Sequence, residues 1–75
     1  MDYEWFKPRN KYPEEDLERI IIIDVEHVNK LDLDNKFNKE YEVKYWKKFW
    51  IGYHNLFPDY NAEVIRWRYK NANEN

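Results

Sequence analysis

The sequence predicts an α+β domain in which a short helix over residues 13–18 precedes a three-stranded antiparallel sheet over about 19–29, 40–54 and 63–70. The prediction rests on an acidic run behind a proline, a run of four isoleucines, and two segments in which aromatic and polar residues alternate. An extended N-terminal arm over 1–12 and a frayed tail over 71–75 flank the single compact domain expected over 13–70.

The predicted helix begins at Pro13, because proline suits the first helical position. Glu14, Glu15 and Asp16 follow it, and acidic side chains complement the positive N-terminal end of a helix. In the arm, Lys7-Pro8 disfavours a helix at the residue before the proline. The arm is therefore expected to be extended and the helix to be confined to 13–18.

The run Ile20–Ile23 leaves two interpretations open. Four consecutive β-branched residues pack well on a sheet and lose side-chain freedom in a helix, which favours a strand over 19–29. The alternative is a longer helix over 14–31 packed on a β-hairpin. It rests on helical spacing at Leu17, Ile20, Ile21, Val25, Val28 and Leu31.

The two remaining strands follow from alternation. Odd positions from 41 to 53 carry Tyr41, Val43, Tyr45, Phe49, Ile51 and Tyr53, interrupted by a lysine. A helix capped by Asp34 and ending at Gly52 competes with this strand, but its rings would spread around the whole helix. Further along, Ile65, Trp67 and Tyr69 alternate with basic residues, which is typical of a half-buried strand.

The composition disfavours disulfide-stabilised, zinc-thiolate and membrane proteins. The 75 residues are 43% apolar and 20% aromatic and contain no cysteine, so neither disulfides nor thiolates stabilise the fold. No segment is long and apolar enough for a membrane span, and residues 1–5 lack the features of a signal peptide, so we expect a cytoplasmic protein. The net charge is −2, yet residues 41–75 hold six Lys/Arg against four Asp/Glu.

Candidates for catalysis are weak. Asp24 and Glu26 share one side of a predicted strand, but a solvated sheet face is the better explanation for them. Glu42-Val43-Lys44 with Asp59 resembles part of a metal-dependent nuclease site in the wrong order, and neither histidine has a second ligand at metal-binding spacing. We therefore expect no enzymatic activity, no metal site and no cofactor.

The most informative pattern is basic residues interleaved with aromatic ones, in segments 44–50 and 66–70. If these segments were adjacent strands, one face would present the candidate partner-binding residues Lys44, Trp46, Lys48, Trp50, Arg66 and Arg68. The competing interpretation is that the rings form the core and the basic residues are merely solvated.

These patterns predict a small adaptor or inhibitor that binds a protein partner, since Trp, Tyr and Arg dominate interface hot spots. The alternative is a single-stranded nucleic-acid-binding module, in which cations bind phosphates and rings stack on bases. A further option is that the N-terminal arm, with Tyr3, Trp5 and Phe6, folds over this face or exchanges with a neighbouring chain to give a homodimer. No membrane partner is expected.

Overall fold

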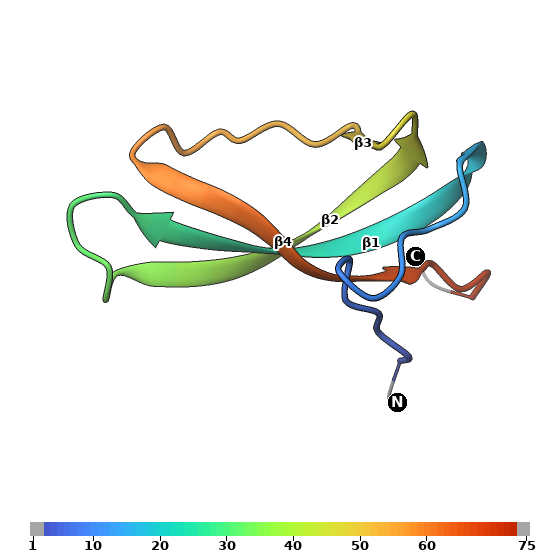
Figure 1. Cartoon of the computed structure of the whole chain (residues 1–75), viewed down its shortest axis with the longest axis horizontal. Coiled ribbons are helices and arrows are strands. Elements are labelled where there is room, and N and C mark those ends of the chain that lie inside the picture. The colour runs from blue at the N-terminus through green and yellow to red at the C-terminus, as the bar shows by residue number, and fades with distance from the viewer. Residues whose placement is uncertain (1–2, 74–75) are drawn as a thin grey trace.

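The computed structural model describes residues 3–73 and consists of one antiparallel sheet (Figure 1). Its four strands are β1 (Asp16–Asn29), β2 (Lys36–Trp46), β3 (Phe49–Ile51) and β4 (Tyr60–Tyr69). The strand order is β3-β2-β1-β4, so the long β1 lies between β2 and β4, while β3 and β4 form the edges. The ends of the predicted arm (1–2) and of the predicted tail (74–75) lie outside the described residues.

The predicted α+β class is wrong, because residues 3–73 contain no helix and the fold is all-β. Both the short helix over 13–18 and the alternative helix over 14–31 are overturned by β1, which begins at Asp16. Pro13 is buried and anchors an extended segment instead of starting a helix. This part of the chain accordingly offers no helix that is long and apolar enough to cross a membrane.

The isoleucine run explains why the strand prevails. Ile21 and Ile23 point to one face of β1 and are fully buried, whereas Ile22, on the other face, is only 6% exposed. Ile22 lies opposite Glu42 of β2 and Arg68 of β4, whose side chains flank it. A central strand buries residues on both faces, which a helix with a single apolar stripe could not do for this run.

The predicted strand over 40–54 is two strands and a loop. β2 begins earlier, at Lys36, and ends at Trp46, and β3 returns after a two-residue turn to end at Ile51. The sheet therefore has four strands and not three, and residues 52–54 belong to the β3–β4 segment. Figure 1 shows this segment (52–59) crossing from one end of the sheet to the other.

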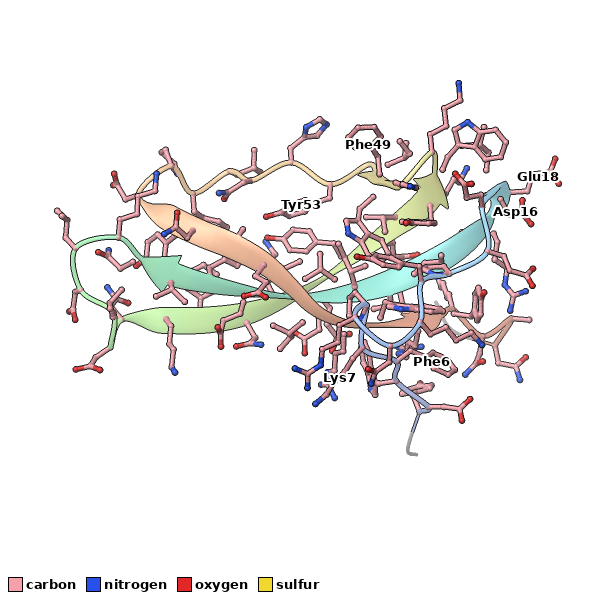
Figure 2. All side chains as sticks on the ribbon, in the orientation of Figure 1. Phe6, Lys7, Asp16, Glu18, Phe49 and Tyr53 are labelled. Atoms are coloured by element: carbon pink, nitrogen blue, oxygen red, sulfur yellow. The ribbon has the colours of Figure 1, made fainter. Side chains whose placement is uncertain are left out.

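The main core lies on one face of the sheet, which we call the core face. It is formed by the buried residues Ile21, Ile23, Val25, Val43, Tyr45 and Trp67. The β3–β4 segment and the arm cover it, with Tyr53 and Phe6 packed against it. Figure 2 shows Tyr53 on the side of the segment that faces the sheet. A single sheet needs such covers, since one of its faces must be shielded from water.

A second aromatic cluster surrounds His27, which also points to the core face and is fully buried. Its ring stacks on Phe37 with centroids 4.7 Å apart and meets Phe57 edge-on at 5.1 Å. Its Nε2 lies 3.0 Å from the Tyr41 hydroxyl, whereas Nδ1 has no hydrogen-bond partner within residues 3–73. Burial lowers the pKa of His27 below the ordinary 6.5, and the charge of Lys39 lowers it further.

The arm forms one backbone bridge to β4, at the Phe6–Trp67 pair. Phe6 and Trp67 exchange two backbone hydrogen bonds of 2.8 Å, and their rings lie 4.8 Å apart. The indole Nε1 of Trp67 donates to the carbonyl of Lys11 at 2.7 Å, and Tyr12 stacks on Tyr45. The arm is thus pinned across the core by aromatic contacts, although it turns at residues 8–10 and is not extended throughout.

Candidate interaction surface

The hairpin that joins β2 to β3 is held by an unusual turn. Trp46 pairs with Phe49, so only Lys47 and Lys48 form the loop, with φ of 51° and 66°. Two-residue hairpins favour positive φ at both positions and normally use Asn or Gly there. A left-handed conformation costs roughly 1–2 kcal/mol for each residue that carries a Cβ. The two lysines at this tip are therefore held in a strained backbone conformation.

The hairpin exposes apolar side chains on the face opposite the core, which we call the outer face. Cross-strand pairing puts Trp46 beside Phe49 and Lys44 beside Ile51. The exposed fractions of Trp46, Phe49 and Ile51 are 37%, 68% and 43%. Figure 2 shows Phe49 directed away from the space between Tyr53 and the sheet. We call this surface the hairpin patch; it consists of Lys44, Trp46, Lys47, Lys48, Phe49 and Ile51.

Trp50 does not belong to this patch. It pairs with Tyr45, so it points to the core face, where its ring lies 4.8 Å from Tyr45 and 6.4 Å from Tyr12. The sequence pattern put Trp46 and Trp50 on one side because both occupy even positions. A two-residue turn reverses that parity, since residues paired across it share a face. The even-numbered Trp50 is therefore a core residue and the odd-numbered Phe49 is exposed.

Arg66 and Arg68 also lie on the outer face, where the arm covers Arg68 and leaves the Arg66 side chain 44% exposed. The Arg66 guanidinium lies 4.1 Å from the Trp5 ring, and that of Arg68 lies 3.7 Å from the Tyr3 ring. Arg66 also donates from Nε to Asp24 Oδ2 at 2.8 Å. Arg68 is only 5% exposed. Both cations are therefore engaged with residues of the same chain.

The two predicted basic segments are not adjacent, because β1 separates β2 from β4. Between the hairpin patch and the arginines, the outer face is acidic. It carries Glu40, Glu42, Asp24 and Glu26, and the Glu42 carboxylate pairs with the Lys70 ammonium at 2.7 Å. The six residues singled out from the sequence thus fall into three places: the hairpin patch, the core, and the end of β4 covered by the arm.

The weak catalytic candidates have structural partners. Asp24 accepts hydrogen bonds from Arg66 and from the Asn38 amide, and Glu42 is paired with Lys70. His27 is enclosed by rings, while His54 is exposed on the β3–β4 segment. Within residues 3–73, no three His, Asp or Glu side chains are placed to share a metal ion.

Sequence reasoning missed Phe49 and Ile51 as surface residues. The option that the arm folds over this face agrees with the stacking of Trp5 and Tyr3 on the two arginines. The pair Lys47-Lys48 between aromatic residues was the available signal for a turn, but it lacks the Gly or Asn that usually marks one. No local signal could reveal the stacking of Tyr3 on Arg68, since the two residues are far apart in the chain.

Comparison of the chain with protein-family models, with curated proteins and with solved structures found no match. The chemistry of the hairpin patch therefore carries the functional proposal. Its features are exposed rings, three lysines, and a strained turn that holds them together.

Proposed function

We propose that this protein is a small, non-enzymatic adaptor or inhibitor that binds a protein partner through the hairpin patch. The observation that carries the proposal is the exposed Trp46–Phe49 pair beside a turn of two lysines with positive φ. Strained backbone conformations outside glycine are concentrated at functional sites. Exposed aromatic residues grouped on one face are typical of interfaces.

The patch has the chemistry of an interface core with a basic rim. Trp46, Phe49 and Ile51 supply adjoining apolar surface, and Lys47 and Lys48 supply charge at the tip. A partner with an apolar pocket ringed by carboxylates would complement this arrangement. Such a complex needs no cofactor, and the proposal retains the cytoplasmic location predicted from the sequence.

The proposal keeps Lys44, Trp46 and Lys48 of the predicted partner-binding residues. It assigns packing roles to Trp50 and Arg68, because the first contacts the core and the second is buried beneath Tyr3. Truncating either side chain would change the stability of the fold before it changed binding.

Single-stranded nucleic acid is the competing partner, since rings flanked by lysines also stack on bases and bind phosphates. The acidic side chains of the adjoining outer face disfavour a polyanion that extends beyond the hairpin. Titration of tryptophan fluorescence with single-stranded oligonucleotides at about 50 and about 200 mM salt separates the two, because phosphate contacts weaken steeply with salt. Saturable quenching that is lost at the higher salt would replace the protein partner with nucleic acid.

The direct test is quantitative capture from cell extract by the immobilised protein and by the double variant Trp46→Ser/Phe49→Ser. The variant should retain at most about a tenth of the partner, since hot-spot residues each contribute about 2 kcal/mol or more. The matched control is Leu31→Ser/Leu33→Ser, which removes two apolar side chains that are 98% and 70% exposed.

Equal capture by the wild type and the Trp46/Phe49 variant would contradict the proposal. So would an equal loss in the Leu31/Leu33 control, because exposed apolar surface in general would then explain the binding. Sedimentation of the purified chain tests whether the partner is a second copy of the chain. In that case the wild type would sediment as a dimer and the Trp46/Phe49 variant as a monomer.

A further inference from the structure

The edge of β4 is a second surface of interest, and it lies away from the hairpin patch. β4 pairs with β1 on one side only, and on its other side the arm reaches it at the Phe6–Trp67 pair. Along residues 61–66, no strand of the described chain pairs with this outer side. At Tyr60 the backbone is already bonded, since its N–H donates to the Phe57 carbonyl at 3.0 Å and its carbonyl accepts from the Asn55 amide at 3.2 Å. Unpaired strand edges accept a further strand readily, because their backbone donors and acceptors are already aligned.

The arm leaves this edge because of Pro8. Continuing the antiparallel ladder from the Phe6–Trp67 pair would bring Pro8 opposite Ile65, and proline has no N–H to donate. The chain turns instead, with Asn10 and Lys11 donating backbone hydrogen bonds to the Lys7 carbonyl at 2.9 and 3.0 Å. At the same level β4 carries a bulge, where Ile65 has no partner in the β1 register.

A groove of about 730 Å³ separates the arm from β4 at this point. Pro8, Val64 and Ile65 contribute apolar surface to it, and a Trp5 ring and a Tyr12 ring extend that surface. Lys7 and Arg9 line the arm side, against a single carboxylate, Glu63, on the strand side. No ion pair joins Lys7 or Arg9 to another residue within 3–73.

We infer that this edge groove binds an extended, acidic peptide segment of a partner protein, which adds to the sheet as a strand beside β4. The peptide would lie along the part of the β4 edge from which the arm turns away at Pro8. Its backbone would pair with the open edge, and alternate side chains would enter the apolar groove. Its carboxylates would face Lys7 and Arg9, whose charges are uncompensated, which supplies the charge complementarity.

The inference does not depend on the hairpin patch, because the groove is at the β4 edge and the patch is at the β2–β3 end. Figure 2 shows Lys7 and Phe49 on opposite sides of the molecule. The two surfaces can therefore be disabled separately.

The experiment is fluorescence anisotropy of the full chain with a labelled peptide of about eight residues that alternates valine and glutamate, a length suited to one added strand. We expect saturable binding of this peptide and none of the same peptide with lysine in place of glutamate. The variant Lys7→Glu/Arg9→Glu should bind the acidic peptide at least about tenfold more weakly, since two exposed ion pairs are lost and like charges replace them.

Two controls locate the binding. Lys36→Glu/Lys39→Glu makes the same change in net charge at exposed lysines of β2, which β1 separates from the β4 edge, and should leave the affinity unchanged. Trp46→Ser/Phe49→Ser should also bind the peptide normally. In the complex, the edge amide hydrogens of β4 between residues 61 and 66 should exchange more slowly, because strand addition protects edge amides.

Several results would overturn the inference. They are failure of the folded protein to bind the acidic peptide, equal binding of the lysine peptide, and equal weakening by the Lys36/Lys39 control. Dissociation of a dimer by Lys7→Glu/Arg9→Glu would instead assign the groove to a second copy of the chain. Displacement of the bound peptide by a single-stranded oligonucleotide would assign it to a nucleic acid.

Discussion

The outer face of the sheet ends in two basic and aromatic regions that look alike in sequence and differ in structure. At the β2–β3 end, Trp46 and Phe49 are exposed beside lysines of a strained turn. At the far end of β4, Arg68 is buried beneath the Tyr3 ring, and the half-exposed Arg66 stacks on the Trp5 ring. The first region presents its rings to solvent, whereas in the second both cations are occupied by rings of the same chain.

The difference shows that interleaved cations and rings do not by themselves make a binding surface. In the covered region, the rings that meet the arginines come from the arm, some sixty residues away in the chain. In the open region, the arm reaches only the core side of the hairpin, where Tyr12 meets Trp50, and no ring or cation within residues 3–73 stacks on Trp46 or Phe49. Distant contacts, and not the local pattern, decide which of the two surfaces is available.

The largest contrast is expected between the tryptophans of the two regions. Trp67→Ala should destabilise the fold by about 3–5 kcal/mol, because its fully buried indole leaves a cavity in the core. Trp46→Ala should cost about 1 kcal/mol or less, since the ring is partly exposed. Urea unfolding measures both, and Trp67→Phe provides a variant that keeps the protein folded. Equal losses would show that Trp46 is a core residue.

The aromatic cluster around His27 is a third region for the comparison, and its expected effect on stability is smaller. His27 has a pKa lowered by burial, so the unfolded chain binds its proton more readily than the folded one. Its contribution to stability should be complete above the unfolded pKa of 6.5 and should be lost as pH falls toward the lowered folded pKa.

Urea midpoints at about pH 7.5 and about pH 5.5 bracket this change. His27→Leu should show a smaller loss on acidification than the wild type, whereas the exposed His54→Gln should behave as the wild type does. If His27→Leu lost as much stability on acidification as the wild type, other groups would account for the pH dependence.

Removing the cover should make the second region resemble the first. Tyr3→Ala/Trp5→Ala removes the rings that stack on Arg68 and Arg66, which should cost about 1–2 kcal/mol. The uncovered guanidinium groups should also retain the protein longer on a heparin column, with a marked dependence on salt. Unchanged retention, with Leu31→Ala/Leu33→Ala as the control, would mean that the arm does not restrict access to the arginines.

The smallest effect on stability is expected at the turn, where it should be favourable. Lys47→Asn/Lys48→Gly places residues that tolerate positive φ in both positions and should stabilise the fold by about 1 kcal/mol. The same change removes two lysines from the hairpin patch and should weaken partner capture. A variant that is stabilised and still captures the partner fully would show that the lysines serve only the turn.

Much of the sheet could be predicted from residue pattern. The expected strand over 19–29 overlaps β1 because consecutive isoleucines suit a central strand that is buried on both faces, and the strand over 63–70 overlaps β4 because alternation marks its buried side at Trp67. The helix over 13–18 could not be excluded locally. Pro13 and the acidic residues after it satisfy helix-start rules, but the burial of Pro13 by distant residues overrides them.

The candidate site was predictable in part. Lys44, Trp46 and Lys48 were identified from the sequence and lie in the hairpin patch, and their role in binding stays a prediction. Phe49 was assigned to the same side as Tyr45, because the strand over 40–54 was expected to continue through Lys47-Lys48. Recognition of the turn at Lys47-Lys48 would have predicted that Phe49 is exposed and that Trp50 is in the core.

The measurement that tests the central claim most directly is ¹⁹F NMR of the protein with its four tryptophans replaced by 5-fluorotryptophan. The signals are assigned by single Trp→Phe variants, and the captured partner is then added. We predict that the Trp46 signal shifts and broadens while the Trp67 signal, from a fully buried ring, stays in place. A complex that leaves the Trp46 signal unchanged and shifts that of Trp5 would show that the partner binds the covered end, and would contradict the assignment of the hairpin patch.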